Sequence, residues 1–300
     1  MNTTSCLRSV GIALALGLPL GACGGESPNP ATPATPASAS TNTSNTTSPT
    51  SPVRSVIRYP SGPDGIGLGG FLQVPAAIHA VVDASDRDAE DKKLDAGRKP
   101  AELLAFAGIK PGMKVAELAA GGGYTTELLA RAVGPSGVVY GQNTAALLEK
   151  FLEKPWSARL AKPVNKNVVR VTRDIDDPLP PEAKDLDAIV FVLFYHDTFW
   201  MKADQAKMNA AVFHALKPGG VYIIVDHSGR PGTGVTEVQS LHRIDEAVVR
   251  KEVVAAGFKL AAEVDFLRTA DDKRDWNASP MGAGEKRGMS DRFVLKFVKP

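Results

Sequence analysis

Cysteine is nearly absent, since the 300 residues contain only Cys6 and Cys23. Both precede the part of the chain that has strand and helix patterns, so that part has neither an intramolecular disulfide nor a thiolate metal site. A charge excess is lacking too, because 35 basic and 33 acidic residues leave a formal net charge of +2. This balance excludes the strongly basic face that nucleic-acid binding requires.

A long hydrophobic run is also missing. The apolar stretch at residues 10–20 is shorter than the roughly 20 residues that span a bilayer, and it has the length of a signal-peptide core. It leads into Leu-Gly-Ala-Cys, ending at Cys23, which resembles the lipobox of bacterial lipoproteins. The resemblance implies removal of residues 1–22, a lipid anchor on Cys23 and a domain facing the periplasm. The alternative is an ordinary signal peptide with an incidental cysteine.

Large apolar side chains are almost absent from residues 24–52, which consist mainly of Pro, Thr, Ser, Ala and Asn. Such a segment cannot bury enough surface to offset its ordering entropy. We therefore expect a signal peptide at residues 1–22, a Pro/Ser/Thr-rich disordered tether at 23–75 and a globular domain at 76–300.

From residue 95 onward, apolar runs of strand length alternate with helical patterns, which indicates βαβ units and a mostly parallel sheet. Only a loop separates the last two expected strands, so they should be antiparallel neighbours. We expect strands at 114–119, 138–142, 168–173, 186–194, 221–226, 258–266 and 291–298, and helices at 100–107, 124–133, 145–152, 202–216 and 244–256.

A glycine-rich loop follows the first of these strands, with Gly121, Gly122 and Gly123 in succession. Glycines let the backbone approach a ligand closely, and the next helix directs its amide end toward that ligand. A dinucleotide pattern starting at Gly121 would need a small residue at 126, where Thr126 stands, and the chain has no phosphate-loop pattern. Residues 115–123 instead resemble motif I of class I S-adenosylmethionine-dependent methyltransferases.

That resemblance extends over most of residues 92–300. It implies an α/β, Rossmann-like methyltransferase sheet of seven strands, mostly parallel with the last strand antiparallel and with helices on both faces. It also implies S-adenosylmethionine as the cofactor, with Glu117 near the methionine ammonium and Gly121 and Gly123 lining the donor. Ala119 stands where the motif usually has its first glycine, and a methyl group there is tolerated only if φ is negative.

Two further positions match donor-binding sites of the family. Asn143 follows the second strand, where the family usually has an acid that holds the ribose hydroxyls. An amide can still accept one hydrogen bond and donate another, without the assistance of charge. Asp174 follows the third strand, at the position that often meets the adenine amine, although it can equally be a solvated loop acid.

Tyr195, His196 and Asp197 follow the fourth expected strand, where methyltransferases place substrate and catalytic groups. A neutral imidazole can remove a proton near pH 7, so we expect His196 to act as general base with Asp197 orienting it. A loop histidine bonded to backbone is the alternative. The resemblance also covers Arg98-Lys99-Pro100, Asp226-His227, His242-Arg243-Ile244-Asp245 and Asp291-Arg292-Phe293.

Three histidines, His196, His227 and His242, and several carboxylates are expected near one sheet edge. They could bind a metal, but no ligand spacing compels it, and we expect no metal centre. The sequence thus predicts a methyltransferase acting on a small-molecule acceptor, with no nucleic-acid partner. The alternative is a catalytically inactive, ligand-binding lipoprotein. Thr126 and the missing acid at position 143 argue against a third possibility, an NAD-dependent dehydrogenase.

Overall fold

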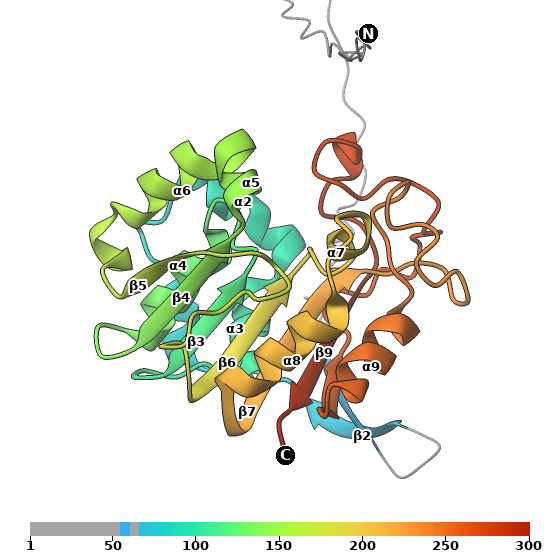
Figure 1. Cartoon of the computed structure of the whole chain (residues 1–300), viewed down its shortest axis with the longest axis horizontal. Coiled ribbons are helices and arrows are strands. Elements are labelled where there is room, and N and C mark those ends of the chain that lie inside the picture. The colour runs from blue at the N-terminus through green and yellow to red at the C-terminus, as the bar shows by residue number, and fades with distance from the viewer. Residues whose placement is uncertain (1–54, 61–65) are drawn as a thin grey trace, which may run out of the picture. The chain divides into compact units, whose positions relative to one another are not determined.

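Figure 1 shows the computed structural model of the chain, which describes residues 55–60 and 66–300. The expected signal peptide at 1–22, the lipidation site Cys23 and the expected tether up to residue 54 lie outside these described residues. Among the helices that are described, none has the length and apolar character needed to cross a membrane.

The strands form one sheet of nine, in the order β2-β1-β8-β9-β7-β6-β3-β4-β5. In chain order they are β1 (Val56–Pro60), β2 (Ile66–Phe71), β3 (Lys114–Leu118), β4 (Val138–Asn143), β5 (Val168–Thr172), β6 (Leu186–Val192), β7 (Leu216–His227), β8 (Lys259–Val264) and β9 (Arg292–Val298).

Strand directions follow the expected plan over seven of the nine strands. The neighbours β7, β6, β3, β4 and β5 run parallel to one another. The last strand, β9, is antiparallel to both β7 and β8, which confirms the expected antiparallel pairing of the last two strands. The sheet is therefore mostly parallel, as a βαβ sequence pattern requires.

The expected number of seven strands is wrong, because β1 and β2 extend the sheet beyond β8. The sheet thus includes residues before the expected domain boundary at 76. The β2 sequence, IGLGGF, carries three glycines, and β1 ends at Pro60. Glycine and proline indicate loops in a sequence but are tolerated in edge strands. Backbone pairing to β8, which the sequence pattern does not reveal, forms this extension.

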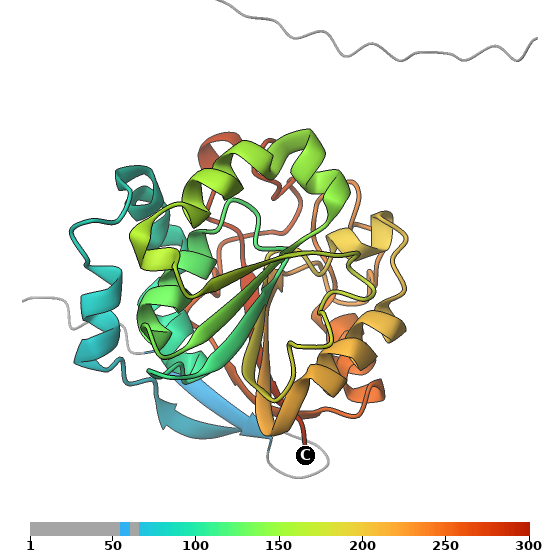
Figure 2. The same ribbon diagram turned by 60° about the vertical axis from the view of Figure 1, so that its left-hand side comes forward.

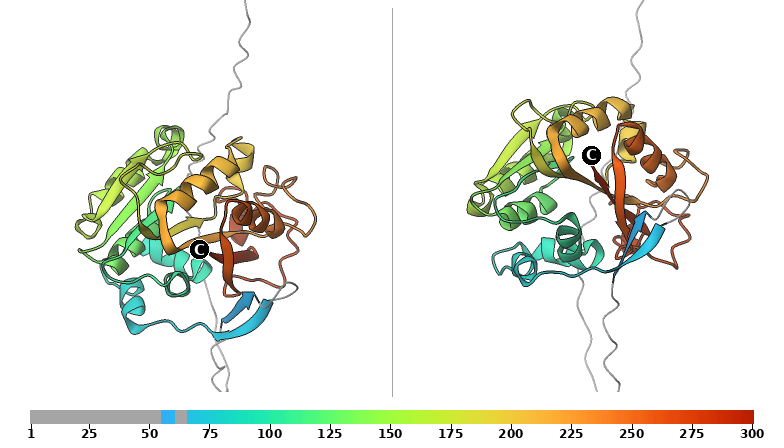
Figure 3. Two further views of the ribbon diagram at one scale, coloured as in Figure 1. Left: turned by 60° about the horizontal axis from the view of Figure 1, so that its bottom comes forward. Right: turned by 90° about the horizontal axis from the view of Figure 1, so that it is seen from below.

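Helices cover both faces of the sheet (Figures 2 and 3). They are α1 (Ala76–Val82), α2 (Ala89–Arg98), α3 (Pro100–Ala107), α4 (Tyr124–Val133), α5 (Ala145–Leu147), a π-helical turn (Leu148–Leu152), α6 (Glu153–Leu160), α7 (Asp197–Trp200), α8 (Gln205–Ala215) and α9 (Glu246–Ala255), with short 3-10 turns at Pro163–Asn165 and Gly284–Lys286.

Alternate residues of the central strands supply two hydrophobic layers. Val190 of β6 and Ile223 of β7 pack with α1, α3 and α4 on one face. Ile189 and Ile224, one position away on the same strands, pack with α8 and α9 on the other face. Because successive side chains of a strand point to opposite faces, a continuous apolar run such as β6 serves both layers.

Candidate functional site

A cavity of about 940 Å³ opens at the carboxyl ends of β3, β6 and β7. It is lined by residues 119–122 of the glycine loop (residues 119–123), by parts of α2 and α6, and by parts of the loop that joins β8 to β9 (residues 265–291). The strand order changes direction between β3 and β6. Open parallel sheets bind their ligands at this switch point, and the cavity has the size of a small-molecule site.

The adjacent strand β4 holds the glycine loop in place. The backbone N–H groups of Ala119 and Ala120 donate to the side-chain and backbone oxygens of Gln142, at 2.9 and 2.8 Å. Gly121 lines the cavity. Gly123 instead lies against Trp156, where a Cβ would come within 2.7 Å of the ring, and its φ is 82°. Only glycine fits there, because both the space and the backbone angle exclude a side chain.

Ala119 has a φ of 48°, in the left-handed region, so the negative φ that an alanine requires is not met. This backbone conformation costs an alanine about 1–2 kcal/mol relative to the right-handed form. Leu193 (φ 58°) and His242 (φ 49°) have the same unusual conformation. All three line the same cavity. Backbone strain of this kind gathers at ligand sites, where the surrounding fold holds it in place.

Asn143, at the end of β4, is fully buried and holds the glycine loop. Its Oδ1 accepts from the backbone N–H of Gly121 at 2.9 Å, and its Nδ2 donates to the carbonyl oxygen of Gly121 at 3.1 Å. Both polar groups of the amide are therefore bonded to one residue of the loop. The side chain expected to hold ribose is thus committed to loop geometry in this structure.

Glu117, at the end of β3, is a buried carboxyl group that lines the cavity. Burial raises its pKa to about 7, although hydrogen bonds from Thr126 and Thr125 and the nearby charge of Arg98 act in the opposite direction. A cation entering the cavity would favour the ionised carboxylate. The position expected to meet the methionine ammonium therefore has the chemistry to do so.

Two arginines with no assigned role in the sequence analysis also line the cavity, Arg98 at the end of α2 and Arg292 at the start of β9. Arg98 lies over the ring of Tyr124 at 4.5 Å, and Arg292 donates to the carbonyl oxygen of Gly97 at 2.5 Å. Burial lowers the pKa of Arg98, and that of Arg292 to about 10. Neither forms an ion pair with a carboxylate among the described residues, so both can receive an anionic group of a ligand.

Two residues expected in the site lie elsewhere. Tyr195 packs in the hydrophobic layer formed with α8 and α9. There its hydroxyl donates to Glu252 at 2.8 Å and accepts from Asn209 at 2.7 Å. Asp174 is exposed in the turn after β5 and is not among the cavity-lining residues. Asp174 therefore matches the alternative of a solvated loop acid. Tyr195 has a packing role.

His196 and Asp197 do lie in the cavity wall, with His242 beside them. The ring Nδ1 of His196 lies 2.7 Å from Asp226 Oδ1, and its Nε2 lies 3.1 Å from Asp197 Oδ1. Burial alone would lower the pKa of His196, but the charge of Asp226 and the hydrogen bonds to both carboxylates outweigh it and raise the pKa to about 10. This is not the neutral imidazole on which the expected general-base role depends.

His227, at the end of β7, provides the neutral imidazole instead. Burial, followed by the charges of His196 and Arg292, lowers its pKa well below the usual value. Its Nδ1 lies 2.7 Å from Ser290 Oγ, and the residue lines the cavity. The sequence marked His227 only as one of three histidines near this edge. Its burial depends on the loop at 265–291, which no local pattern reveals.

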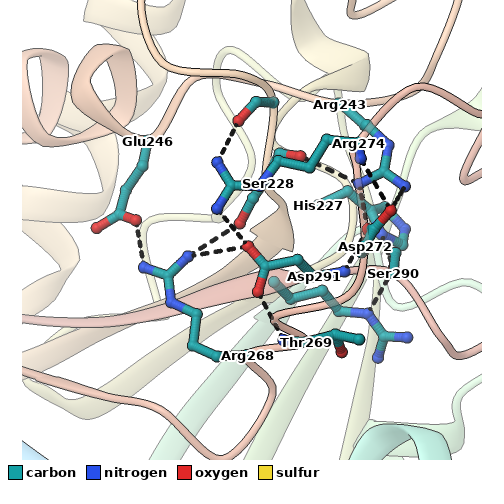
Figure 4. Close-up of polar contacts among 12 residues, drawn as sticks. His227, Ser228, Arg243, Glu246, Arg268, Thr269, Asp272, Arg274, Ser290 and Asp291 are labelled. Atoms are coloured by element: carbon teal, nitrogen blue, oxygen red, sulfur yellow. Dashed lines mark hydrogen bonds and ion pairs between the residues drawn. The ribbon is translucent and has the colours of Figure 1, made fainter.

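Ion pairs fix that loop against the end of β7 (Figure 4). Buried Asp291 pairs with Arg274 at 2.8 Å, and buried Arg243 pairs with Asp272 at 2.9 Å. The Asp272 carboxylate also accepts the backbone N–H of Asp291 at 2.6 Å, which joins the two pairs. The neighbouring residue, Ser290, is thereby held beneath the imidazole ring that it contacts. Buried, mutually bonded charges of this kind define one loop conformation.

No protein-family model and no curated protein matches the chain. Among solved structures, a chain of the complex between the Haloferax volcanii Trm112 methyltransferase activator and a methyltransferase is 18% identical, with a TM-score of 0.50, covering 75% of this chain and 98% of that one. The chain has a methyltransferase fold. A SAM-dependent methyltransferase from Aquifex aeolicus is 19% identical, with a TM-score of 0.49, covering 72% of this chain and 100% of that one. At such identities a methyltransferase fold does not determine the reaction, which must be argued from the site.

Proposed function

We propose that this protein is an S-adenosylmethionine-dependent methyltransferase that acts on a small-molecule acceptor. One observation carries the proposal: a single cavity at the switch point of a methyltransferase fold joins the glycine loop and Glu117 to the buried imidazole of His227. The first two suit the methyl donor, and the third suits proton removal from an acceptor.

The residues present fit the donor. Glu117 is buried with threonine donors but no lysine or arginine within hydrogen-bonding distance among the described residues, so a ligand ammonium would complete its environment. The guanidinium groups of Arg98 and Arg292 are available for the donor carboxylate. Charge-assisted hydrogen bonds of both kinds are about twice as strong as neutral ones. When bound, the donor supplies an electrophilic methyl group on its sulfonium sulfur.

His227 is assigned the proton transfer. In the tautomer whose Nδ1–H donates to Ser290 Oγ, Nε2 is the ring nitrogen that accepts a proton from the acceptor. Methyl transfer needs the acceptor lone pair, and an imidazole that removes a proton from the nucleophile typically accelerates such steps by about 10²–10⁴-fold. Val192 and Phe194 add apolar side chains to the lining of the same cavity.

Calorimetry on the full chain tests the donor site. We expect heat of binding with S-adenosylmethionine and with its demethylated product, S-adenosylhomocysteine. Replacing Glu117 with Ala should weaken binding of both by at least about tenfold, since one charge-assisted bond is worth about 1.5–3 kcal/mol. The exposed Glu149→Ala variant, on the turn after α5, is the matched control and should bind as the wild type does. Absence of heat with both ligands would reject the proposal.

A ligand-binding protein without turnover is the second candidate. It is favoured by the strained Ala119 and by Asn143, whose amide is committed to the loop. Labelled donor incubated with a small-molecule extract of the cell envelope separates the two. The methyltransferase proposal expects demethylated product from the wild type and a loss of about 10²-fold or more in His227→Ala. Donor binding without product supports the binding protein.

The same proposal includes a lipid anchor at Cys23 that holds the domain in the bacterial cell envelope. The motif Leu-Gly-Ala-Cys supports it. Palmitate labelling of cells that express the full chain should mark the wild type and not Cys23→Ala. Such a location requires that the donor reach the periplasmic side, so co-purification of donor with protein from the membrane fraction would support both parts of the proposal.

A further inference from the structure

Three side chains in the cavity wall each bring one nitrogen or oxygen atom within 3.2 Å of the other two. The atoms are His196 Nε2, Asp197 Oδ1 and His242 Nδ1. Their separations are 3.1 Å for His196 to Asp197, 3.2 Å for His196 to His242, and 3.2 Å for His242 to Asp197. The three atoms thus form a nearly equilateral triangle.

Hydrogen bonds also join these atoms, because His196 Nε2 lies 3.2 Å from His242 Nδ1 and both rings face the same Asp197 oxygen. A metal ion bound here would take the place of the ring protons, since imidazole binds metal only through a deprotonated nitrogen. Around a divalent metal with bonds of about 2.1 Å, neighbouring ligand atoms lie about 3.0 Å apart in octahedral geometry and about 3.4 Å apart in tetrahedral geometry. The observed edges of 3.1–3.2 Å fall between these two values.

The surroundings of the triangle fit a metal centre as well. The Nδ1 of His196 faces Asp226 Oδ1 at 2.7 Å, which directs Nε2 toward the other two atoms. Asp226 is itself held by the backbone N–H groups of His196 and His227, both at 2.8 Å. A carboxylate behind a ligating imidazole is the usual outer partner of a protein metal site. Asp197 has a second partner too, because Trp200 Nε1 donates to its Oδ1 at 2.7 Å.

The triangle is closed on one side and open on the other. The side chain of His196 is 3% exposed, whereas those of Asp197 and His242 are 14% and 24% exposed. All three line the cavity, so an ion bound by them would keep coordination positions for a ligand. Three protein ligands with an open position distinguish catalytic metal sites from closed structural ones.

We propose that His196, Asp197 and His242 bind one divalent transition-metal ion of the zinc class, with Asp226 as the outer partner. Two imidazoles and one carboxylate suit Zn²⁺, Fe²⁺, Co²⁺ or Ni²⁺ better than Mg²⁺ or Ca²⁺, which prefer oxygen ligands. Metal binding stands independently of methyl transfer. Its role as a Lewis acid that binds an oxygen or nitrogen of the acceptor, next to His227, rests on the proposed function.

The test is a titration of the full chain, first made metal-free by dialysis against a chelator, with Co²⁺ followed by its visible absorption. We expect one Co²⁺ per chain, displaced by Zn²⁺. His242→Ala and Asp197→Ala should each weaken binding by more than about 100-fold, and Asp226→Asn by about 10–100-fold, the range typical of outer partners. The exposed His79→Ala on α1 is the matched control and should bind as the wild type does.

Equal Co²⁺ binding by His242→Ala and His79→Ala would overturn the assignment, as would the absence of stoichiometric binding by the wild type. X-ray absorption of the zinc-loaded wild type needs no variant and should show two imidazole nitrogens around the metal. A coordination shell without imidazole would also overturn it. Donor calorimetry on the same preparation separates the two proposals, because metal without donor, or donor without metal, rejects only one of them.

Discussion

Asn143→Asp would introduce the acid that methyltransferases commonly carry at the end of the second strand, yet we expect it to weaken this protein. In the structure Asn143 Nδ2 donates to the carbonyl oxygen of Gly121 at 3.1 Å, while Oδ1 accepts from the N–H of the same residue at 2.9 Å. A carboxylate keeps the second bond and loses the first. It also brings an anionic oxygen against a carbonyl oxygen in a position with no solvent exposure.

The magnitude follows from that geometry. Leaving this partly buried acceptor unsatisfied and placing an anion against it costs about 1–3 kcal/mol. A loss of about 2 kcal/mol corresponds to a fall in Tm of about 4–8 °C for a domain of this size. Thermal unfolding and urea titration of Asn143→Asp against the wild type measure it. Gln73→Glu, which adds the same charge at an exposed position, should stay within about 0.5 kcal/mol of the wild type.

The donor affinity of the same variant provides the second readout. The bond to Gly121 fixes the loop that lines the cavity, so Asn143→Asp should bind S-adenosylmethionine more weakly than the wild type. A variant that is as stable as the wild type and binds the donor more tightly would refute the reasoning. That result would mean that an acid can replace the Asn143 amide at this position. It would also mean that the conformation of Gly121 does not require the bond from Nδ2.

Three further predictions concern stability and ligand charge. Burial opposes ionisation of Glu127, but hydrogen bonds from Arg159 and two other cations outweigh it and lower its pKa to about 2. Its stabilising effect is therefore present above pH 4.5 and lost as the pH falls toward 2, so Glu127→Gln should cost up to about 3 kcal/mol at pH 7 in urea titrations and much less at pH 3. Ala119→Val should lower the free energy of unfolding by about 1–3 kcal/mol, because a β-branched residue tolerates a positive φ poorly; an unchanged urea midpoint would contradict the strain. Arg292→Met should weaken calorimetric binding of S-adenosylmethionine at least about tenfold. Lys166→Met removes an exposed cation that follows the Pro163–Asn165 turn and does not line the cavity, so it should leave binding unchanged.

Local signals in the sequence predicted much of the fold. The bounds of α3 and α4 are as expected because each ends at a glycine with positive φ, Gly108 and Gly134. α2 was missed because none of its residues is buried, so it has no apolar stripe, and the cap at Asp88 supports it instead. β1 and the edge strand β2 were missed because glycine and proline mask strands whose pairing is made by distant residues.

The site was predictable only in part, for a related reason. The residues after β3, β4, β6 and β7 were expected at one edge because parallel strands end together, and Glu117, Gly121, His196 and Asp197 do meet at the cavity. Ionisation states were not predictable. The charge on His196 depends on Asp226, 30 positions away, and the neutrality of His227 depends on burial by a distant loop. Tyr195 shows that adjacency in sequence does not place a residue in the site. It precedes His196 directly, yet its side chain packs in the hydrophobic layer of α8 and α9.

The position of β9 has a consequence for how the site comes into being. Although it follows every other strand in the chain, β9 lies between β7 and β8 and pairs with both. Its first residue, Arg292, reaches back 195 positions to Gly97 across the cavity. During synthesis, therefore, the two halves of the cavity wall cannot meet until the residues of β9 have emerged and inserted. Contacts of such long range form late and slowly, and a ligand that binds the finished cavity would selectively retain chains that have completed this insertion.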